Sequence, residues 1–150
     1  MDMMDSNIGD HNAYSKWLLG WLSPQTVYYK DIPAEGMTVT LRPSNEHADA
    51  LFIRIGDPDT DYTELFVIES LTTALNGEEL TRLKQPVVRV LHVEGTLGEA
   101  GLSGNWRAYG FRYDNSYTST KFISVVEADG EDTVLNYFPA SSGAKVSYDA

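Results

Sequence analysis

The feature that most constrains the fold is a change of hydrophobic period at Pro24. From there on, short runs rich in Val, Ile, Tyr, Phe and Thr alternate with turn sequences such as IPAEG and RPSNEHAD. A period of two is typical of strands with one buried face, and Gly, Pro, Asn and Asp favour the turns between them. The predicted strands are residues 26–30, 37–42, 50–55, 63–70, 86–93, 106–113, 121–128 and 144–148.

Regularly spaced strands of this kind predict a mainly β fold, with an antiparallel β-sandwich formed by residues 25–150. The run at 86–93 is almost continuously apolar, which predicts a central strand covered on both faces. Residues 76–84 are compatible with a turn of helix inside a longer connection. The pair Asp129-Gly130 suits a tight hairpin turn.

One short α-helix is expected before the strands, within residues 1–24. Asp10 is a candidate N-cap, and Ala13, Trp17 and Trp21 recur at helical spacing. Gly20 is expected to end the helix in a left-handed conformation. A helix this apolar on one side needs a partner surface, which is either the sheet of this chain or another polypeptide.

Composition excludes several classes of partner. The chain is 42% hydrophobic and has a net charge of −11, so it has enough apolar material for a core but no excess of Lys and Arg. Binding to nucleic acid or to an anionic membrane surface requires clustered basic residues, and neither is expected. The segment MDMMDSNIGD has neither the basic nor the apolar region of a signal peptide, so the chain is expected to carry no export signal.

The histidines do not form a zinc signature. His11, His47 and His92 are the three in the chain, and none lies four residues from another, so the H-E-x-x-H pattern is missing. There is no cysteine and no G-x-S-x-G motif. We therefore predict no catalytic residue and no zinc ligand. His92, close to Glu94 on a predicted strand, is interpreted as a hydrogen-bonded structural residue.

A weak calcium motif occurs in the sequence GDPDTDY. Asp57, Asp59 and Asp61 stand at alternate positions, as in the first half of an EF-hand loop. The glycine expected at loop position six is replaced by Tyr62, and the glutamate expected at position twelve by Ile68. An acidic turn is the preferred interpretation, and calcium binding stays open.

Four stretches together resemble the immune inhibitor A family of secreted bacterial zinc metallopeptidases, peptidase family M-six. DMMDSNIGDHNAYSKWLLGW is similar to the family segment after the zinc helix, where a methionine turn precedes a helix. ELFVIESLTTAL, VVRVLHVEG and FRYDNSYTSTKFISVVEADG resemble later strands of the family. The residues that carry the family pattern are Asp10, His11, Asn12, Trp21, Glu69, His92, Asp129 and Gly130.

The resemblance implies a C-terminal, non-catalytic portion of such a peptidase. Met3 and Met4 are the two candidates for the methionine turn, and the zinc helix would lie upstream of Met1. Zinc is expected only together with that upstream catalytic half, which is the implied partner. Glu94 stands where the family has aspartate, and Ser70 and Leu71 replace a polar residue and an arginine. An extracellular location follows from the resemblance alone.

Two other hypotheses remain. In one, the chain is a stand-alone β-sandwich module that binds a glycan or a protein. In the other, it is an orphan domain without independent function. A portion of a larger peptidase should expose a large apolar surface around Trp17 and Trp21, or hide it by self-association through the N-terminal helix. A stand-alone module should cover that helix with its own sheet.

Overall fold

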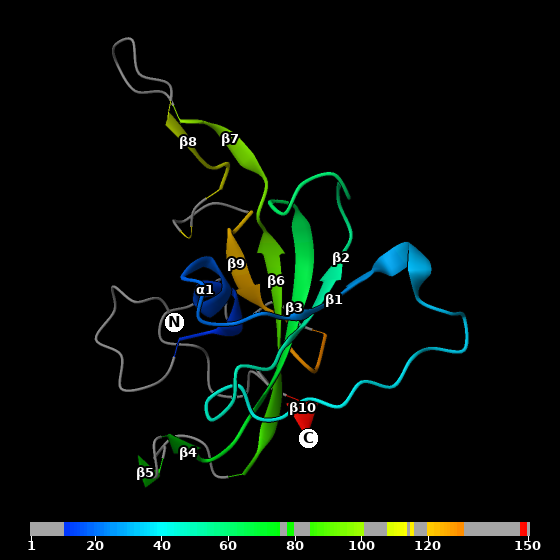
Figure 1. Ribbon diagram of the computed structural model, residues 1–150, viewed down its shortest axis with the longest axis vertical. Helices are drawn as coiled ribbons and strands as arrows, with labels where there is room; N and C mark the ends of the chain where they lie inside the picture. The colour runs from blue at the N-terminus through cyan, green and yellow to red at the C-terminus, as the bar shows by residue number, and fades with distance from the viewer. Residues whose placement is uncertain are drawn as a thin grey trace.

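The computed structural model describes residues 11–75, 78–79, 85–100, 108–113, 115, 120–130 and 148–149, and these residues form one short helix and a set of mostly short strands (Figure 1). This confirms the mainly β class with a short N-terminal helix. The elements are α1 (Ala13–Leu18), β1 (Gln25–Tyr28), the 3-10 turn η1 (Tyr29–Asp31), β2 (Leu51–Arg54), β3 (Glu64–Leu71), β4 (Ala74–Leu75), β5 (Glu78–Glu79), β6 (Val87–Glu94), β7 (Leu97–Ala100), β8 (Ala108–Phe111), β9 (Ile123–Val125) and β10 (Tyr148–Asp149).

The long strands β3 and β6 form the centre of a six-stranded sheet. Its order is β1-β2-β3-β6-β10, and β9 also pairs with β6. β3 and β6 are antiparallel along their whole length, from Glu64 opposite Glu94 to Leu71 opposite Val87. The pairs β2/β3, β6/β9 and β6/β10 are antiparallel as well. The central position predicted for residues 86–93 is therefore confirmed.

Two predictions about the edge of this sheet were wrong. β1 and β2 are parallel, with Gln25 opposite Leu51, whereas an antiparallel sheet was expected. The connection between them, residues 29–50, is long enough to return the chain to the same end of the sheet, as parallel pairing requires. Residues 37–42 form no strand, and at their end the backbone N–H of Arg42 donates to the carboxylate of Asp49. An alternating pattern predicts a strand only where a partner strand lies alongside.

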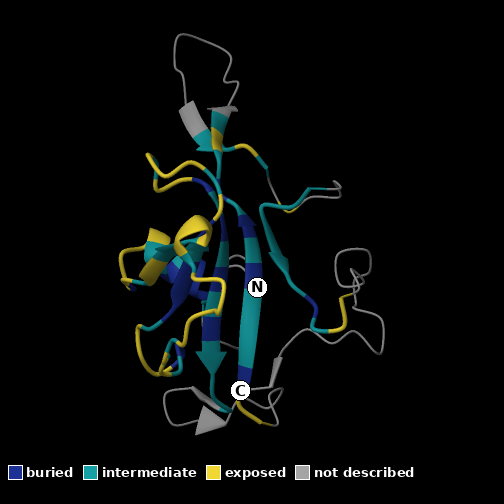
Figure 2. Ribbon diagram, turned by 90° about the vertical axis from the view of Figure 1, so that its right-hand side faces the viewer, coloured by how far each residue is buried: buried dark blue, intermediate teal, exposed yellow. Residues whose placement is uncertain are grey.

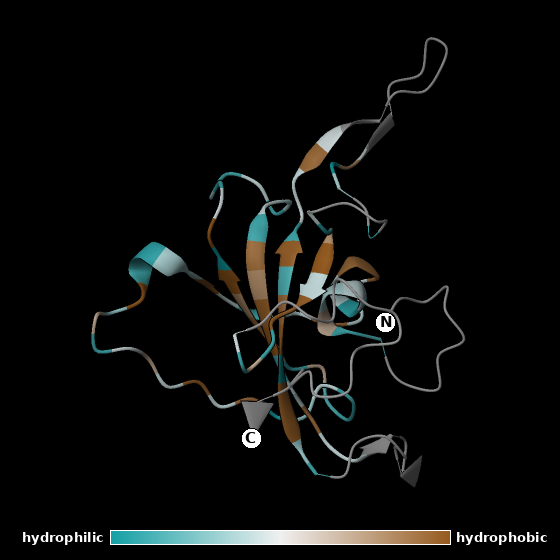
Figure 3. Ribbon diagram, turned by 180° about the vertical axis from the view of Figure 1, so that it is seen from behind, coloured by the Kyte–Doolittle hydropathy of each residue, from teal (hydrophilic) through white to brown (hydrophobic). Residues whose placement is uncertain are grey.

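The core lies between the central sheet and α1. Along β3 the side chains alternate, so that Leu65, Val67 and Glu69 are buried on the helix side. Figure 2 shows buried residues gathered in the middle strands, and Figure 3 shows hydrophobic residues along the same strands. The buried apolar residues of the cluster are Ala13, Tyr14, Leu22, Ala50, Phe52, Leu65, Val67, Leu91 and Val93.

The opposite face of the sheet is only half-buried, so the coverage on both faces predicted for residues 86–93 was wrong. Phe66, Ile68 and Val90 on β3 and β6 are of intermediate exposure there. Outside the central sheet, the described strands form the two-stranded pairs β4/β5 and β7/β8. The sandwich stays a prediction, because residues 131–147 lie outside the described part.

Both ends of α1 are set by local sequence. The N-cap is Asn12 and not Asp10 as predicted, and Oδ1 of Asn12 accepts the backbone N–H of Ser15 at 2.8 Å. Gly20 has φ of 73°, as predicted, and its N–H donates to Trp17 O while the N–H of Trp21 donates to Lys16 O. This pair of bonds is a Schellman motif, which ends the helix at Leu18. Trp21 therefore lies beyond the helix and does not continue its buried face, contrary to the predicted spacing.

Of the remaining predicted runs, 106–113 contains β8 and 121–128 contains the shorter strand β9. The run 144–148 meets β10 at Tyr148, and residues 144–147 lie outside the described residues. The segment 76–84 was expected to hold a turn of helix, but its described residues, Glu78–Glu79, form strand β5 against Ala74–Leu75. Asp129 and Gly130 lie in a turn, where Gly130 has φ of 80°. Positive φ favours glycine, which agrees with the turn predicted at this position.

Candidate functional site

A fully buried carboxylate fixes α1 on the sheet. Glu69 on β3 has 0% of its surface exposed and lies directly opposite Arg89 on β6. Its Oε1 accepts from Arg89 Nε at 2.8 Å, and the ion pair with Arg89 places Nη2 2.7 Å from the same oxygen. Its Oε2 accepts from Ser44 Oγ at 2.7 Å and from the backbone N–H of Ala13 at 3.2 Å. A buried charge is tolerated when it is paired and hydrogen-bonded in this way.

A second contact holds the middle of the helix. Lys16, which is almost fully buried, donates from Nζ to the backbone carbonyl of Ser44 at 2.5 Å. Ser44 thus contacts α1 through Lys16 and Glu69 through its hydroxyl. These bonds and the Asn12 cap orient a helix of only six residues, which would be marginal in water by itself.

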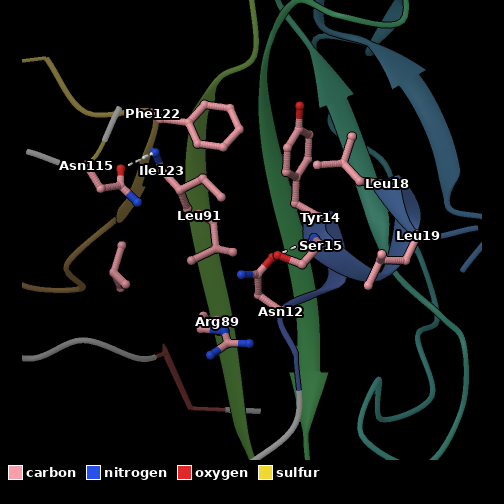
Figure 4. Close-up of a pocket in the computed structure, with 11 residues that line it drawn as sticks. Asn12, Tyr14, Ser15, Leu18, Leu19, Arg89, Leu91, Asn115, Phe122 and Ile123 are labelled. Atoms are coloured by element: carbon pink, nitrogen blue, oxygen red, sulfur yellow. Dashed lines mark hydrogen bonds between the residues drawn. The ribbon is translucent and has the colours of Figure 1, made fainter. Parts of the chain in front are cut away.

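A cavity of about 260 Å³ lies between α1 and the strands β6 and β9 (Figure 4). Its walls are mainly apolar, and the guanidinium of Arg89 and the amide of Asn12 lie at one end, with Asn115 at the side (Figure 4). An apolar chamber with a few polar groups at its edge is the usual form of a site for a small ligand or a partner's side chain. The lining residues are Asn12, Tyr14, Ser15, Leu18, Leu19, Arg89, Leu91, Asn115, Phe122, Ile123 and Val125.

Tyr14 forms the centre of the aromatic core beside this cavity. Its ring lies within 6.3 Å, centroid to centroid, of the rings of Trp17, Phe52, Phe111 and Phe122. Burial, followed by the nearby Tyr62 hydroxyl, raises the pKa of Tyr14 well above its ordinary value. Within the described ranges, its buried hydroxyl has no hydrogen-bond partner.

Gly95 leaves the room that this hydroxyl occupies. A Cβ atom at Gly95 would lie 2.8 Å from Tyr14 Oη and 2.7 Å from the backbone oxygen of Thr63. Both distances are shorter than any ordinary contact of a carbon atom. The turn after β6 therefore approaches α1 so closely that only glycine fits.

The outward side of α1 and the turn after it expose apolar side chains. Leu18, Leu19 and Trp21 are 41%, 40% and 59% exposed, and we call these three residues the α1 surface. Trp17 is partly buried against Tyr62 and Phe52. The helix is thus covered by its own sheet on one side and open on the other.

A polar cluster lies on the face of the sheet opposite α1. Nε2 of His92 lies 2.9 Å from Oε1 of Glu64 and 3.9 Å from Oε1 of Glu94. The hydrogen bond with Glu64 agrees with the structural interpretation of His92. Glu64 was missed, because only the register of β3 against β6 places it opposite Glu94.

The three aspartates of the calcium-like motif do not converge. They lie in the exposed turn between β2 and β3. Asp57 Oδ1 accepts the backbone N–H of Asp59 at 2.9 Å, and Asp61 forms an ion pair with Arg54. These are the contacts of an acidic turn, and calcium binding there stays a prediction.

The other residues of the family pattern do not all lie together. His11 packs its ring 5.6 Å from the ring of Trp21, next to the helix cap Asn12. Met3, Met4 and Asp10 lie outside the described residues. Asn12 and Glu69 thus both contact the first turn of α1, while His92 lies on the other face of the sheet.

The chain matches no protein-family model, no curated protein and no solved structure. The described residues include no helix of the length and apolarity needed to cross a bilayer. The function must therefore be argued from the residues and their geometry.

Proposed function

We propose that this chain is a non-catalytic, β-rich portion of an immune inhibitor A-like zinc metallopeptidase, and that it docks on the catalytic half through the α1 surface. The observation that carries the proposal is the exposure of Leu18, Leu19 and Trp21 at a helix whose other side is hydrogen-bonded to Glu69 and Ser44. The resemblance supplies the identity of the partner, and an extracellular location belongs to the same proposal.

The chemistry agrees with a non-catalytic role. Peptide hydrolysis by zinc needs a metal-bound water and a general base, which zinc peptidases of this kind take from an H-E-x-x-H helix. The sequence contains no such motif. Protein hydrolysis therefore requires the catalytic half, and this chain contributes a docking surface and support for the active-site floor.

The α1 surface has the properties of a preformed docking site. Two leucines and a tryptophan lie next to one another in sequence, and Trp21 is held by the Schellman turn at Gly20. Tryptophan is enriched among residues that dominate binding energy, since its large ring loses little conformational entropy on binding. The bonds of Glu69 and Lys16 fix the helix in advance, which lowers the cost of association.

A stand-alone binding module is the second candidate, and the cavity beside Arg89 favours it. Its volume suits a small group rather than an extended glycan, because sites for drug-sized ligands reach about 300–1,000 Å³. A ligand there would place an anionic or hydrogen-bonding group near Arg89 and an apolar body against Leu91 and Phe122.

The proposal is tested on the purified chain with and without zinc. We expect no cleavage of a labelled casein in either case, and concentration-dependent self-association by light scattering, because the uncovered α1 surface has no catalytic half to bind. The variant Trp21→Ser with Leu19→Ser should stay monomeric. Tyr29→Ser is the matched control, since Tyr29 is 67% exposed on η1, outside the α1 surface. Zinc-dependent cleavage, or a wild-type chain that is monomeric at every concentration, contradicts the proposal.

A further inference from the structure

The cluster of Glu64, His92 and Glu94 is built by strand register. Glu64 begins β3 and Glu94 ends β6, and the two residues are directly opposite each other. His92 stands two residues before Glu94, so its side chain lies on the same face of the sheet. The cluster therefore lies at the end of the central sheet from which the chain continues to β7 (Figure 1), on the face of the sheet opposite α1.

The three donor atoms already converge. Nε2 of His92 and one carboxylate oxygen of each glutamate all lie within 4.8 Å of one another. The shortest separation is 2.9 Å and another is 3.9 Å. Tetrahedral zinc at its usual bond lengths places its ligand atoms about 3.3 Å apart. Small side-chain rotations would bring all three donors to that spacing without movement of the strands.

The ring of His92 is oriented by its neighbour. Its centroid lies 5.1 Å from that of Phe66, the residue opposite it on β3. Across the other edge of β6, His92 faces Ser124 on β9. A ligand imidazole needs a fixed orientation, and this packing supplies it before any ion arrives.

Two carboxylates placed directly opposite each other repel. Like charges at opposed positions of an antiparallel pair destabilise the sheet, and both glutamates are partly buried here. A divalent cation between them would replace the repulsion by two attractive contacts. All three side chains keep some exposure, so water can fill the remaining coordination positions.

We propose that Glu64, His92 and Glu94 form a zinc site with three protein ligands, which joins β3 to β6. The imidazole nitrogen favours zinc over calcium and magnesium, which prefer oxygen ligands in larger number. The site lies on the opposite face of the sheet from the α1 surface. It is independent of the proposed function, because a zinc site that joins strands requires no peptidase activity.

Zinc binding is measured by competition with a chromophoric chelator, with zinc as the only added metal. We expect one zinc per chain, and a rise in melting temperature of about 5 to 10 °C when free zinc is about 100 times Kd. His92→Gln should weaken binding at least about tenfold, and Glu94→Gln similarly, since each removes a ligand. His47→Gln is the matched control, because His47 is exposed in a loop far along the chain from the cluster.

A spectroscopic measurement on the wild-type chain avoids any folding defect of the variants. With ¹⁵N-labelled histidine, zinc should shift the Nε2 resonance of His92 and leave that of His47 unchanged. Equal affinity in His92→Gln and wild type overturns the proposal, as does binding of calcium without binding of zinc. Stoichiometric zinc lost in His92→Gln, without cleavage of casein, supports this site and leaves the non-catalytic proposal intact.

Discussion

Replacement of Glu69 by glutamine should destabilise the protein strongly, although the two side chains have the same shape. Oε1 of Glu69 accepts a hydrogen bond from Arg89 Nε and forms an ion pair with the guanidinium, and Oε2 accepts from Ser44 Oγ and from the N–H of Ala13. An amide has one oxygen and one NH₂ group. In either orientation the NH₂ faces a donor, namely the guanidinium or the helix N–H. The variant therefore loses a charge and also leaves a donor unsatisfied.

The expected magnitude follows from burial. Removal of one partner of a buried ion pair costs about 3–5 kcal/mol, because the other charge remains uncompensated. The Arg89 side chain is 21% exposed and regains some hydration, so the lower end, about 3 kcal/mol, is expected. For a domain of this size that loss lowers the melting temperature by roughly 6–12 °C.

The assay is urea unfolding of wild type and Glu69→Gln, combined with amide hydrogen exchange of residues 13–18. Exchange in α1 should accelerate more than exchange in β6, because the helix loses the contact at its first residue. The double variant Glu69→Met with Arg89→Met should cost less than the sum of the single changes, since it leaves no buried charge unpaired. A Glu69→Gln variant within about 0.5 kcal/mol of wild type would refute this reasoning.

Two further predictions concern close packing and pH. Gly95→Ala should lower the free energy of unfolding in urea by about 1–3 kcal/mol, because the new Cβ meets Tyr14 Oη and a backbone oxygen. Tyr14→Phe added to this variant should recover part of the loss, since it removes the hydroxyl that the Cβ meets. Gly98→Ala is the control, since its Cβ would meet nothing closer than 3.4 Å, and an equal loss in both would contradict the argument. The hydrogen bond from the Arg42 side chain, followed by that from its backbone N–H, lowers the pKa of Asp49 to about 2. Because the pKa of Asp49 is lower in the folded state, the pair stabilises the protein above pH 4, and this stabilisation is lost between about pH 4 and pH 2. Asp49→Asn should remove that part of the acid transition in a series of thermal melts at different pH. A difference in melting temperature between the two proteins that is the same at pH 2 and at pH 6 would count against the prediction.

The tests of the α1 surface and of the zinc site address different faces of the sheet and different observables. The proposed self-association depends on Leu19 and Trp21, and the proposed zinc site depends on His92 and Glu94. Either result can therefore stand without the other. Casein cleavage links them, because only a catalytic chain would combine zinc binding with hydrolysis.

Local sequence was sufficient for most elements. The alternating runs placed β2 and β3, the nearly continuous apolar run placed β6, and Gly20 predicted the end of α1, because these features depend on the side-chain pattern and on a single backbone conformation. The same reasoning failed at residues 37–42, since pairing needs a neighbour that a local pattern cannot supply. It also extended the helical face to Trp21, beyond the turn that ends the helix.

What the sequence alone determined is the mainly β class with a short helix, because period and turn residues act over a few positions. Only the tertiary structure decided which residues meet. Glu64 and Glu94 are 30 positions apart in the chain, and the antiparallel register of β3 and β6 makes them neighbours. Glu69 likewise holds α1 on the sheet only because the fold places Arg89 opposite it on β6 and the N–H of Ala13 within hydrogen-bonding distance. Which distant residues meet depends on the order and register of all the strands together, and no single stretch of sequence specifies these.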